Sequence, residues 1–392
     1  MKAFVEFPND IRQKLIELRR DLHQHPELSF KEEQTYLRLF NELKSLNVDS
    51  IERVAGTGVF AQIKGQNRNA PVVALRGDID ALPIQEETGL KYSSANPGVM
   101  HACGHDIHAS WIVAAAYSLM QKPAAGDVVL ILQPAEEVGK GALAMIKAGV
   151  LKGVKAIFGA HVDRRFLVGQ VVAQEGPLAA SSDEFYIELI GRGAHAARPH
   201  EALDPIVGAG ALVGALQTIV SRRKNPAFPA VVTVGTINAG TAPNVIPDKA
   251  KLSGTIRAVD SATRQFLIEE VRRIAKSQAA SYGLTGRVRI EEGTPPIVNP
   301  ERTTAWARQA AASVLGEAGL TKMETLNLAA EDFAFYMEKI PGCFLRIGAR
   351  EKGGEVIPAH SGKFYVAEES IFIGGAVLAE AARIASASLA KK

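Results

Sequence analysis

The chain has 392 residues, of which 47% are apolar and 22% charged, and its formal net charge at pH 7 is +3. This length exceeds what one hydrophobic core usually serves, so two domains are expected. The charge is small and Lys and Arg are scattered along the chain, which gives no support to nucleic-acid binding. The presence of only two cysteines argues against a disulfide framework and fits a reducing compartment.

Targeting and membrane segments are not expected. The first eight residues lack a sustained apolar run followed by a small-residue cleavage site, so we predict no signal peptide. The most lipid-like run, residues 206–216, is shorter than the roughly 20 residues that a membrane-spanning helix needs. We therefore predict a soluble, cytoplasmic protein with no membrane association.

Helices and strands alternate over the first half of the chain. The first predicted helix starts near residue 9 and ends before Pro26. Further helices are predicted over residues 32–47, 107–121 and 140–149. The predicted strands cover residues 58–63, 71–75, 128–132 and 154–158. Because several of these strands are apolar on both faces, we predict an α/β fold with a largely parallel central sheet flanked by helices.

The order of elements changes near residues 181–182. Strand, helix, strand, strand, helix and strand are predicted over residues 185–190, 204–222, 231–237, 251–259, 261–282 and 287–291. This order is typical of an α+β ferredoxin-like domain. The α/β pattern then resumes, with helices over residues 302–316, 331–338 and 369–387. We therefore predict one domain formed by residues 1–181 and 294–392, and an inserted domain formed by residues 182–293.

Four side chains that commonly bind metal ions lie within one short segment: His101, Cys103, His105 and His108. In an extended loop, alternate positions point the same way, so Cys103 and His105 can reach one ion together, and Gly104 permits a tight turn between them. A thiolate beside an imidazole suits zinc or a neighbouring late transition metal. The alternative is a histidine-rich loop that holds no metal.

Carboxylates and an imidazole follow the predicted strands of the first half. Three successive strands lead into Asp78 and Asp80, into Glu136 and Glu137, and into His161. In an open α/β sheet, ligands bind beyond the carboxyl ends of the strands, so these side chains and the Cys/His segment are expected at one edge. Their convergence favours a metal site over the histidine-rich loop.

The adjacent residues Glu136 and Glu137 are suited to two different chemical roles. Neighbouring side chains in an extended segment point opposite ways, so one carboxylate can bind a metal while the other faces a water held by that metal. A metal lowers the pKa of its bound water, and a nearby carboxylate can pass the proton to a leaving nitrogen. The pair therefore favours metal-assisted hydrolysis, and the alternative is a solvated surface pair.

Four segments together resemble the M20 metallopeptidase family. Within it, the chain is most similar to the aminoacylase and carboxypeptidase branch, which contains hippurate hydrolases and indole-acetyl-amino-acid hydrolases. The segments are RGDIDALP at 76–83, HACGHD at 101–106, QPAEE at 133–137 and GAHAA at 193–197. They occur in the family's order, and the similarity runs from about residue 18 to the last predicted helix.

The resemblance implies a metal-dependent amidohydrolase that cleaves the amide bond of N-acyl amino acids into a carboxylate and a free amino acid. The alternatives are a dipeptidase or carboxypeptidase acting on short peptides, and a catalytically idle metal- or ligand-binding protein. It also implies two divalent metal ions per subunit, zinc in preference to manganese, cobalt or nickel. Their ligands would be Cys103, His105, Glu137, His161 and His360. Glu136 would be the general base, and its presence beside these ligands argues against an idle protein.

The resemblance further implies that the inserted domain is a lid through which the subunits form a homodimer or a higher oligomer. His195 would stabilise the oxyanion of the tetrahedral intermediate in the partner subunit's site. Asn244 and Arg257 would hold a substrate carboxylate or carbonyl, which suits a bidentate guanidinium. Asp80 and Asp106 would orient the ligands or the metals. The alternatives are a loop histidine without a role, a structural arginine, and two aspartates that cap helices.

Two positions depart from the family's pattern. Ala329 and Ala330 stand where relatives have Gly-Ser, and Gly362 stands where they have Pro after the histidine and serine at 360–361. Neither change removes a predicted ligand, so metal binding should be retained. Substrate choice is the property that these positions would alter.

Overall fold

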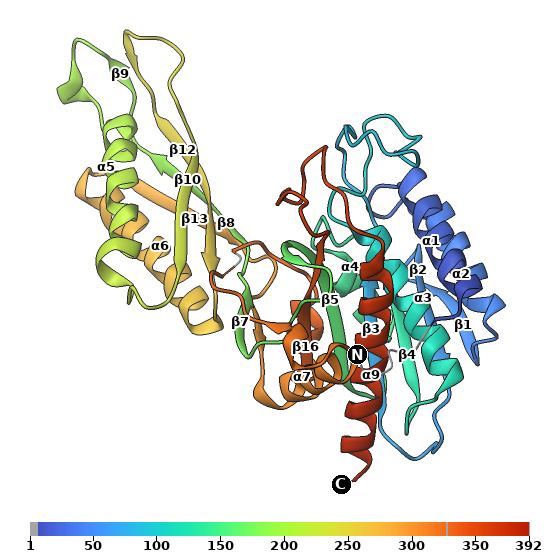
Figure 1. Cartoon of the computed structure of the whole chain (residues 1–392). Helices are drawn as coiled ribbons and strands as arrows, with labels where there is room; N and C mark the ends of the chain where they lie inside the picture. The colour runs from blue at the N-terminus through green and yellow to red at the C-terminus, as the bar shows by residue number, and fades with distance from the viewer. Residues whose placement is uncertain (1–6, 327, 392) are drawn as a thin grey trace. The chain divides into compact units, whose positions relative to one another are not determined.

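The computed structural model describes residues 7–326 and 328–391, which form two compact units (Figure 1). The first unit comprises the described residues up to Gly176, Asn299–Thr325 and those from Asp332 onward. The second comprises Pro177–Val298 and the described part of Leu326–Glu331, a segment that the sequence analysis assigned to the first domain. Most of the N-terminal segment in which no signal peptide is predicted lies outside the described residues.

The elements of the first unit alternate between helix and strand. Its helices are α1 (Asn9–Gln24), α2 (Glu33–Ser45), α3 (His105–Gln121), α4 (Gly141–Lys147), α7 (Glu301–Leu315), η3 (Glu317–Gly319), α8 (Ala334–Met337) and α9 (Glu369–Ala390). Its strands are β1 (Ser50–Val54), β2 (Gly58–Ile63), β3 (Val72–Asp78), β4 (Val128–Gln133), β5 (Val154–Leu167), β6 (Val171–Val172), β15 (Leu320–Thr321) and β16 (Gly342–Arg350).

Within the described residues these strands form one sheet, in the order β1-β2-β4-β3-β5-β16-β6-β15. The central strands β4, β3, β5 and β16 pair in parallel, whereas β2 joins β4 and β6 joins β16 in antiparallel fashion. Strands β3, β4 and β16 are almost wholly buried, and β5 is buried over residues 156–160, as expected for strands covered on both faces. The predicted fold class is confirmed.

Helices α3 and α9 pack closely together in the core of the first unit. A methyl group on Gly374 would come 2.2 Å from Trp111 Nε1, so only glycine allows this approach. The same indole Nε1–H donates a hydrogen bond to the Ser370 carbonyl at 2.7 Å. Because α3 is buried on nearly every side, the residues at its N-terminus are held on a rigid element.

Two elements differ from their predicted bounds in ways that bear on the site. Helix α3 begins at His105 rather than at residue 107. Strand β5 runs on to Leu167, so His161 lies within the strand and does not follow it. The reason is tertiary, since β16 pairs with β5 in parallel well beyond the apolar run that the sequence reveals.

The second unit has the predicted ferredoxin-like order. Its main elements are β8 (Asp183–Ile190), α5 (Pro205–Thr218), β10 (Ala230–Ala239), β12 (Lys249–Ala258), α6 (Ser261–Ser281) and β13 (Thr285–Glu291). The strands form an antiparallel sheet in the order β10-β12-β8-β13, and α5 and α6 cover one face (Figure 1). The carboxylates of Asp204 and Asp260 cap the two helices by accepting backbone N–H groups.

Short elements complete the second unit, and the first and last of them each include one residue of the first unit. They are β7 (Gly176–Ala179), β9 (Ala194–His195), η1 (Pro199–Glu201), η2 (Ile219–Arg223), β11 (Val245–Ile246) and β14 (Ile297–Asn299). Strands β9 and β11 form a small antiparallel ribbon, and β7 pairs with β14.

Two described helical segments have the length and composition that a membrane-spanning helix would need. One is α9, whose most apolar stretch is 83% buried, as in a core helix. The other is Pro205–Arg223, of which only 33% is buried. It is longer than the predicted apolar run because the π-helical turn η2 continues α5 without a break. The expectation of a run too short to span a membrane is therefore wrong for this helix.

Candidate metal centre

The Cys/His segment folds as a turn that enters helix α3. Gly104 has a left-handed backbone (φ 88°) and immediately precedes the helix, whose first residue is His105. A Cβ at Gly104 would lie 2.6 Å from Val162 Cγ2, so the turn requires glycine. The predicted extended loop is wrong, and this turn brings Cys103 and His105 to the same place by a different geometry.

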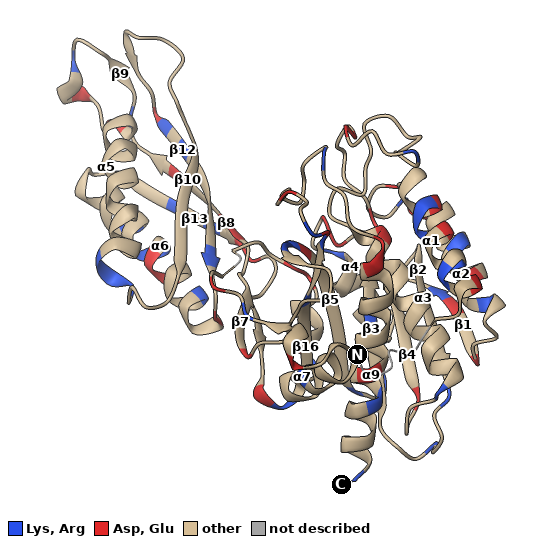
Figure 2. Ribbon diagram, viewed as in Figure 1, with Lys and Arg blue, Asp and Glu red and all other residues tan. Residues whose placement is uncertain are grey.

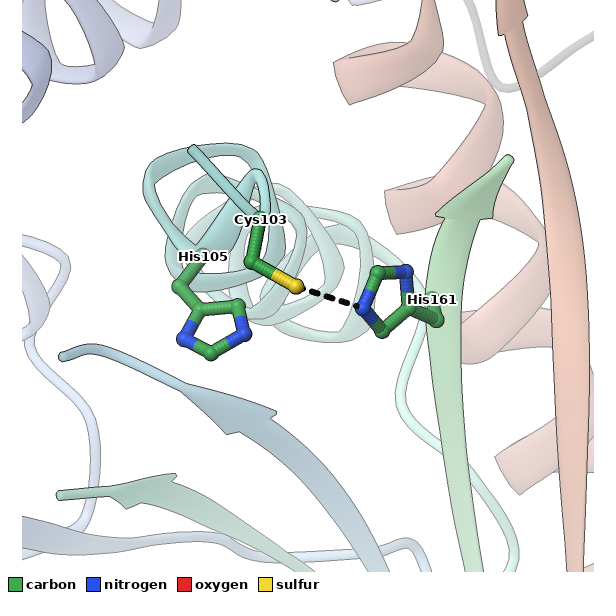
Figure 3. A group of neighbouring side chains, drawn as sticks. All are labelled: Cys103, His105 and His161. Carbon is green, nitrogen blue, oxygen red and sulfur yellow. Dashed lines mark hydrogen bonds between the residues drawn. The ribbon is translucent and has the colours of Figure 1, made fainter. Parts of the chain in front are cut away.

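Cys103, His105 and His161 form one compact group (Figure 3). Their potential ligand atoms all lie within 4.8 Å of one another, and Cys103 Sγ is 3.2 Å from His161 Nε2. Two ligands of one tetrahedral zinc ion, with bonds of about 2.3 Å to sulfur and about 2.0 Å to nitrogen, lie about 3.5 Å apart. The group therefore has nearly the spacing that a metal ion requires.

Both imidazoles have their second nitrogen fixed by the protein. The Nδ1–H of His105 donates to the Asp80 backbone oxygen at 2.9 Å and to its carboxylate at 3.2 Å. The Nδ1–H of His161 donates to the Val162 carbonyl at 2.7 Å. These bonds leave Nε2 of each ring available to bind a metal ion beside the Cys103 sulfur, the arrangement typical of metal-binding histidines.

A second group shares Cys103 with the first. Cys103, Glu137 and His360 offer ligand atoms within 4.8 Å of one another, and His360 Nε2 lies 3.5 Å from Glu137 Oε2. His105, Glu136 and Glu137 form a third overlapping group. The five predicted ligands thus lie together, and the shared cysteine divides them into two adjacent positions.

Two of the five residues have buried ligand atoms without a hydrogen-bond partner, which fits a cation site. His105 Nε2 and Glu137 Oε1 are buried without a hydrogen-bond partner, although such atoms are costly to bury unpaired. Burial raises the pKa of the Cys103 thiol, and Glu137 raises it further. Burial lowers the pKa of His105, but Asp78 and the Cys103 sulfur more than reverse this. Both shifts reflect a buried, strongly negative environment that a metal ion would balance.

Asp80 forms hydrogen bonds with residues of more than one of these ligand groups. It is 1% exposed, and besides His105 it accepts the Ser29 hydroxyl at 2.7 Å and the backbone N–H groups of Glu136 and Glu137 at 3.0 and 3.1 Å. Burial would raise its pKa, but these donors, with His105 foremost, hold the pKa below its usual value. An ionised Asp80 therefore sets the position of one imidazole and of both glutamates.

The turn that presents Glu136 and Glu137 depends on Glu32, which the sequence analysis did not single out. Ala135 has a left-handed backbone (φ 56°) and is fully buried. Its N–H donates to Glu32 Oε1 at 3.0 Å, while Thr57 donates to the other carboxylate oxygen at 2.6 Å. A buried carboxylate thus holds the chain in a conformation that costs about 1–3 kcal/mol for a non-glycine residue.

A fully buried network lies around the carboxyl ends of β3 and β4. Arg76 donates to Gln133 at 2.8 Å, to Asp78 at 2.5 Å and to Asp332 at 2.7 Å. His108 donates from Nδ1 to Asp78 at 2.6 Å and accepts the Val162 N–H on Nε2 at 3.0 Å. Both nitrogens of His108 are therefore engaged by protein groups, which supports a structural role rather than metal ligation.

Asp106 faces away from the predicted ligands. Its Oδ2 lies 2.8 Å from both Arg19 Nε and His23 Nδ1, and His23 Nε2 lies 3.3 Å from Glu86. His101 is buried nearby, and burial lowers its pKa to about 4. Asp106 thus anchors the first turn of α3 to α1 instead of contacting an imidazole ligand.

The remaining predicted site residues belong to the second unit. His195 lies in β9 opposite Val245 of β11, and the Ala196 N–H donates to the Asn244 carbonyl at 3.0 Å, so His195 and Asn244 are neighbours. Both line one hollow of this unit, together with Lys249 at the start of β12. Arg257 lies eight residues further along β12, about 26 Å away at about 3.3 Å per residue. The structure does not bring Arg257 together with the other two.

The two departures from the family's pattern lie in ordered segments. The Ala329 carbonyl accepts the Ala180 N–H at 3.1 Å within the second unit. The Gly362 carbonyl accepts the Glu87 N–H at 2.7 Å, and a Cβ at Gly362 would lie 2.6 Å from the Gln85 carbonyl. Glycine at 362 is thus required by close packing against a neighbouring loop.

Comparison with known proteins defines the class of protein. Residues 74–384 match the model of peptidase family M20/M25/M40, and the chain belongs to this family. The predicted family and the predicted class, a metal-dependent amidohydrolase, are confirmed.

Individual relatives match over nearly the whole chain. N-acetylcysteine deacetylase of Bacillus subtilis (strain 168) is 42% identical over 95% of this chain and 96% of its own length. Thermostable carboxypeptidase 1 of Saccharolobus solfataricus is 38% identical over 95% and 96%. The crystal structure of the Bacillus subtilis YxeP protein, described as a dinuclear metal binding peptidase, is 39% identical over 96% and 99%, with a TM-score of 0.85.

Proposed function

We propose that this chain hydrolyses the amide bond of N-acyl amino acids, releasing a carboxylate and a free amino acid, with two divalent metal ions per subunit. The observation that carries the proposal is the position of Glu136. One carboxylate oxygen accepts the Asp332 N–H at 3.3 Å, and the other lies 4.0 Å from His105 Nε2. A carboxylate anchored on one oxygen and directed at the ligand groups with the other suits a general base.

The five clustered side chains would hold the metals. Cys103, His105 and His161 would form one position, and Glu137 and His360 would complete the other with the shared cysteine. Bound divalent ions would supply Lewis-acid activation of a water molecule and of the scissile carbonyl. Thiolate and imidazole donors with one carboxylate favour zinc over manganese, cobalt or nickel.

Glu136 would transfer a proton from the attacking water to the leaving nitrogen. It accepts a proton from the attacking water as the new C–O bond forms, and returns it to the amide nitrogen as the C–N bond breaks. Asp80, through the backbone N–H of Glu136, and Asp332 keep the carboxylate in place during both transfers. The anchoring lets one residue serve as base and then as acid.

His195 is suited to stabilise the oxyanion. Its Nδ1 accepts the Ala197 N–H at 3.1 Å, so the ring proton resides on Nε2 and can be donated to an oxygen. Asn244 beside it would hold the substrate's carbonyl or carboxylate. Arg257 would hold the same substrate group from the opposite end of β12. This distance is too great for one substrate to contact both Arg257 and the pair His195 and Asn244 of the same subunit. The two sets would therefore serve different active sites.

A homodimer through the second unit meets this requirement, and a higher oligomer built from such dimers is compatible with it. Helix α5 exposes Ile206 (46%) and Val207 (53%), and the edge strand β10 exposes Ile237 (52%). Adjacent exposed apolar side chains on a helix and an unpaired strand edge commonly mark a subunit interface. Lys and Arg are interspersed with Asp and Glu on both units (Figure 2), a distribution that favours small-molecule over nucleic-acid substrates.

A dipeptidase or carboxypeptidase is the second candidate, favoured by the 38% identity to thermostable carboxypeptidase 1. The same residues would cleave a peptide bond, so the candidates differ only in the acyl part of the substrate. We also propose a cytoplasmic location, supported by two buried cysteines that are both free.

The test compares Glu136→Gln with the wild type on N-acetyl, N-benzoyl and N-indoleacetyl amino acids and on dipeptides, after metal content has been measured. We expect two ions per chain in both proteins and a loss of turnover of about 10²–10⁴-fold in the variant, the usual contribution of general acid–base catalysis.

Glu137→Gln is the matched control, since the neighbouring carboxylate should lose metal as well as activity. Native turnover by Glu136→Gln would refute the assignment of the base. Full activity of the metal-free wild type would refute the metal-dependent mechanism. Preference for dipeptides over all N-acyl amino acids would establish the second candidate instead.

A further inference from the structure

The loop that carries His360 presents this side chain on a strained backbone. It connects β16 with α9, and His360 is 54% exposed with a left-handed backbone (φ 65°). The His360 N–H donates to the Ala102 carbonyl at 2.8 Å. An exposed ligand with this strained backbone depends on how the rest of its loop is anchored.

Arg164 anchors that loop on both sides of His360. Its guanidinium donates to the Glu355 carbonyl from Nε at 3.2 Å and from Nη2 at 2.7 Å, and to the Tyr365 carbonyl from Nη1 at 2.9 Å. Glu355 lies five residues before His360 and Tyr365 five residues after it. One side chain therefore closes the base of the segment that presents the histidine.

Further contacts make Arg164 a rigid clamp. It is 2% exposed, pairs with the Glu351 carboxylate at 3.2 Å and stacks over the Tyr365 ring at 4.1 Å. The Tyr365 hydroxyl donates to the same Glu351 carboxylate. Arg350 donates in turn to the Arg164 carbonyl at 2.9 Å. The planar fork of a guanidinium suits this set of acceptors, whereas a lysine ammonium cannot reach all of them together.

The clamp comes from the strand that also carries a predicted ligand. Arg164 and His161 both lie in β5, three residues apart. We propose that Arg164 is a positioning residue that sets His360 against Glu137, so that β5 determines the geometry of both metal positions. This inference rests on the proposed two-metal site, and it adds a residue that acts on only one of the two positions.

The test measures zinc bound per chain by equilibrium dialysis over a series of buffered free zinc concentrations. We expect two ions in the wild type. In Arg164→Gln we expect the position formed by Glu137 and His360 to weaken by about 10–100-fold, the usual effect of losing an orienting partner, while the other is unchanged. Arg165→Gln is the matched control, because Arg165 is exposed and pairs with Asp163 instead of the loop.

His360→Ala separates positioning from general damage. In the His360→Ala variant, the metal position formed by Glu137 and His360 is already impaired. Adding Arg164→Gln to this variant should therefore cause no further loss of zinc affinity. A further loss there, or unchanged binding of both ions by Arg164→Gln, would overturn the inference. If Arg164→Gln does not fold, Arg164→Lys keeps the buried charge and should weaken the same position. Fewer than two ions in the wild type would instead overturn the two-metal site itself.

Discussion

Replacing Asp80 by Asn should destabilise the metal-free chain because all the polar partners of this buried carboxylate are donors. They are the Ser29 hydroxyl, the His105 Nδ1–H and the backbone N–H groups of Glu136 and Glu137. An asparagine keeps one acceptor oxygen and turns an NH₂ group toward the donors that met the other. With the oxygen on the side of His105, the NH₂ group can donate to the Ser29 hydroxyl but faces the Glu137 N–H, so at least one buried donor is left unpaired.

The magnitude follows from that count. A buried donor without its acceptor costs about 1–3 kcal/mol, so the substitution should lower the free energy of unfolding by about that amount. The effect should depend on pH, because the pKa of Asp80 lies below its usual value. The contribution of the carboxylate is complete above the unfolded pKa of about 3.9. It is lost as the pH falls through the folded pKa, so the wild type's advantage should shrink below about pH 4.

Urea denaturation of the metal-free proteins at pH 7 measures this difference. Ser29→Ala is the control, since it removes one donor and leaves the carboxylate intact, and should cost about 1 kcal/mol. Zinc affinity should fall by about 10–100-fold in Asp80→Asn because the charged acceptor that helps to orient His105 is lost. An Asp80→Asn protein with the same free energy of unfolding as the wild type would refute the reasoning.

Substitutions of two further buried residues should each lower stability, and for one of them the effect should depend on pH. Glu32→Ala should lower the free energy of unfolding by about 1–3 kcal/mol, because the two backbone N–H groups and the hydroxyl that donate to Glu32 lose their acceptor; urea denaturation measures it, and an unchanged midpoint would contradict the role of the turn. His23→Gln tests pH dependence: burial lowers the pKa of His23, but Asp106 and Glu86 raise it overall. Its stabilisation is complete below the unfolded pKa of about 6.5 and is lost as the pH rises through the folded pKa. The gap between wild type and His23→Gln should therefore be wider at pH 6 than at pH 9 in thermal melts, and a gap that widens with pH would exclude a protonated His23.

The sequence by itself determined the fold class and most of the candidate site. A strand such as residues 128–132 is apolar on both faces, so local composition suffices to predict a parallel sheet. The ferredoxin-like order likewise follows from the periodicity of each segment. The chemistry of Cys103, His105 and Glu137 is a property of the residue types, so the metal hypothesis follows from the sequence.

Only the tertiary structure decided how these residues meet. The sharing of Cys103 between two ligand groups depends on the left-handed turn at Gly104, and the place of His161 depends on the pairing of β5 with β16. Glu32 and Arg164 stand far along the chain from the residues they hold, and neither belongs to a motif. Both residues act through hydrogen bonds between segments that are distant in the sequence. A local sequence pattern does not reveal which distant group a buried charge will contact.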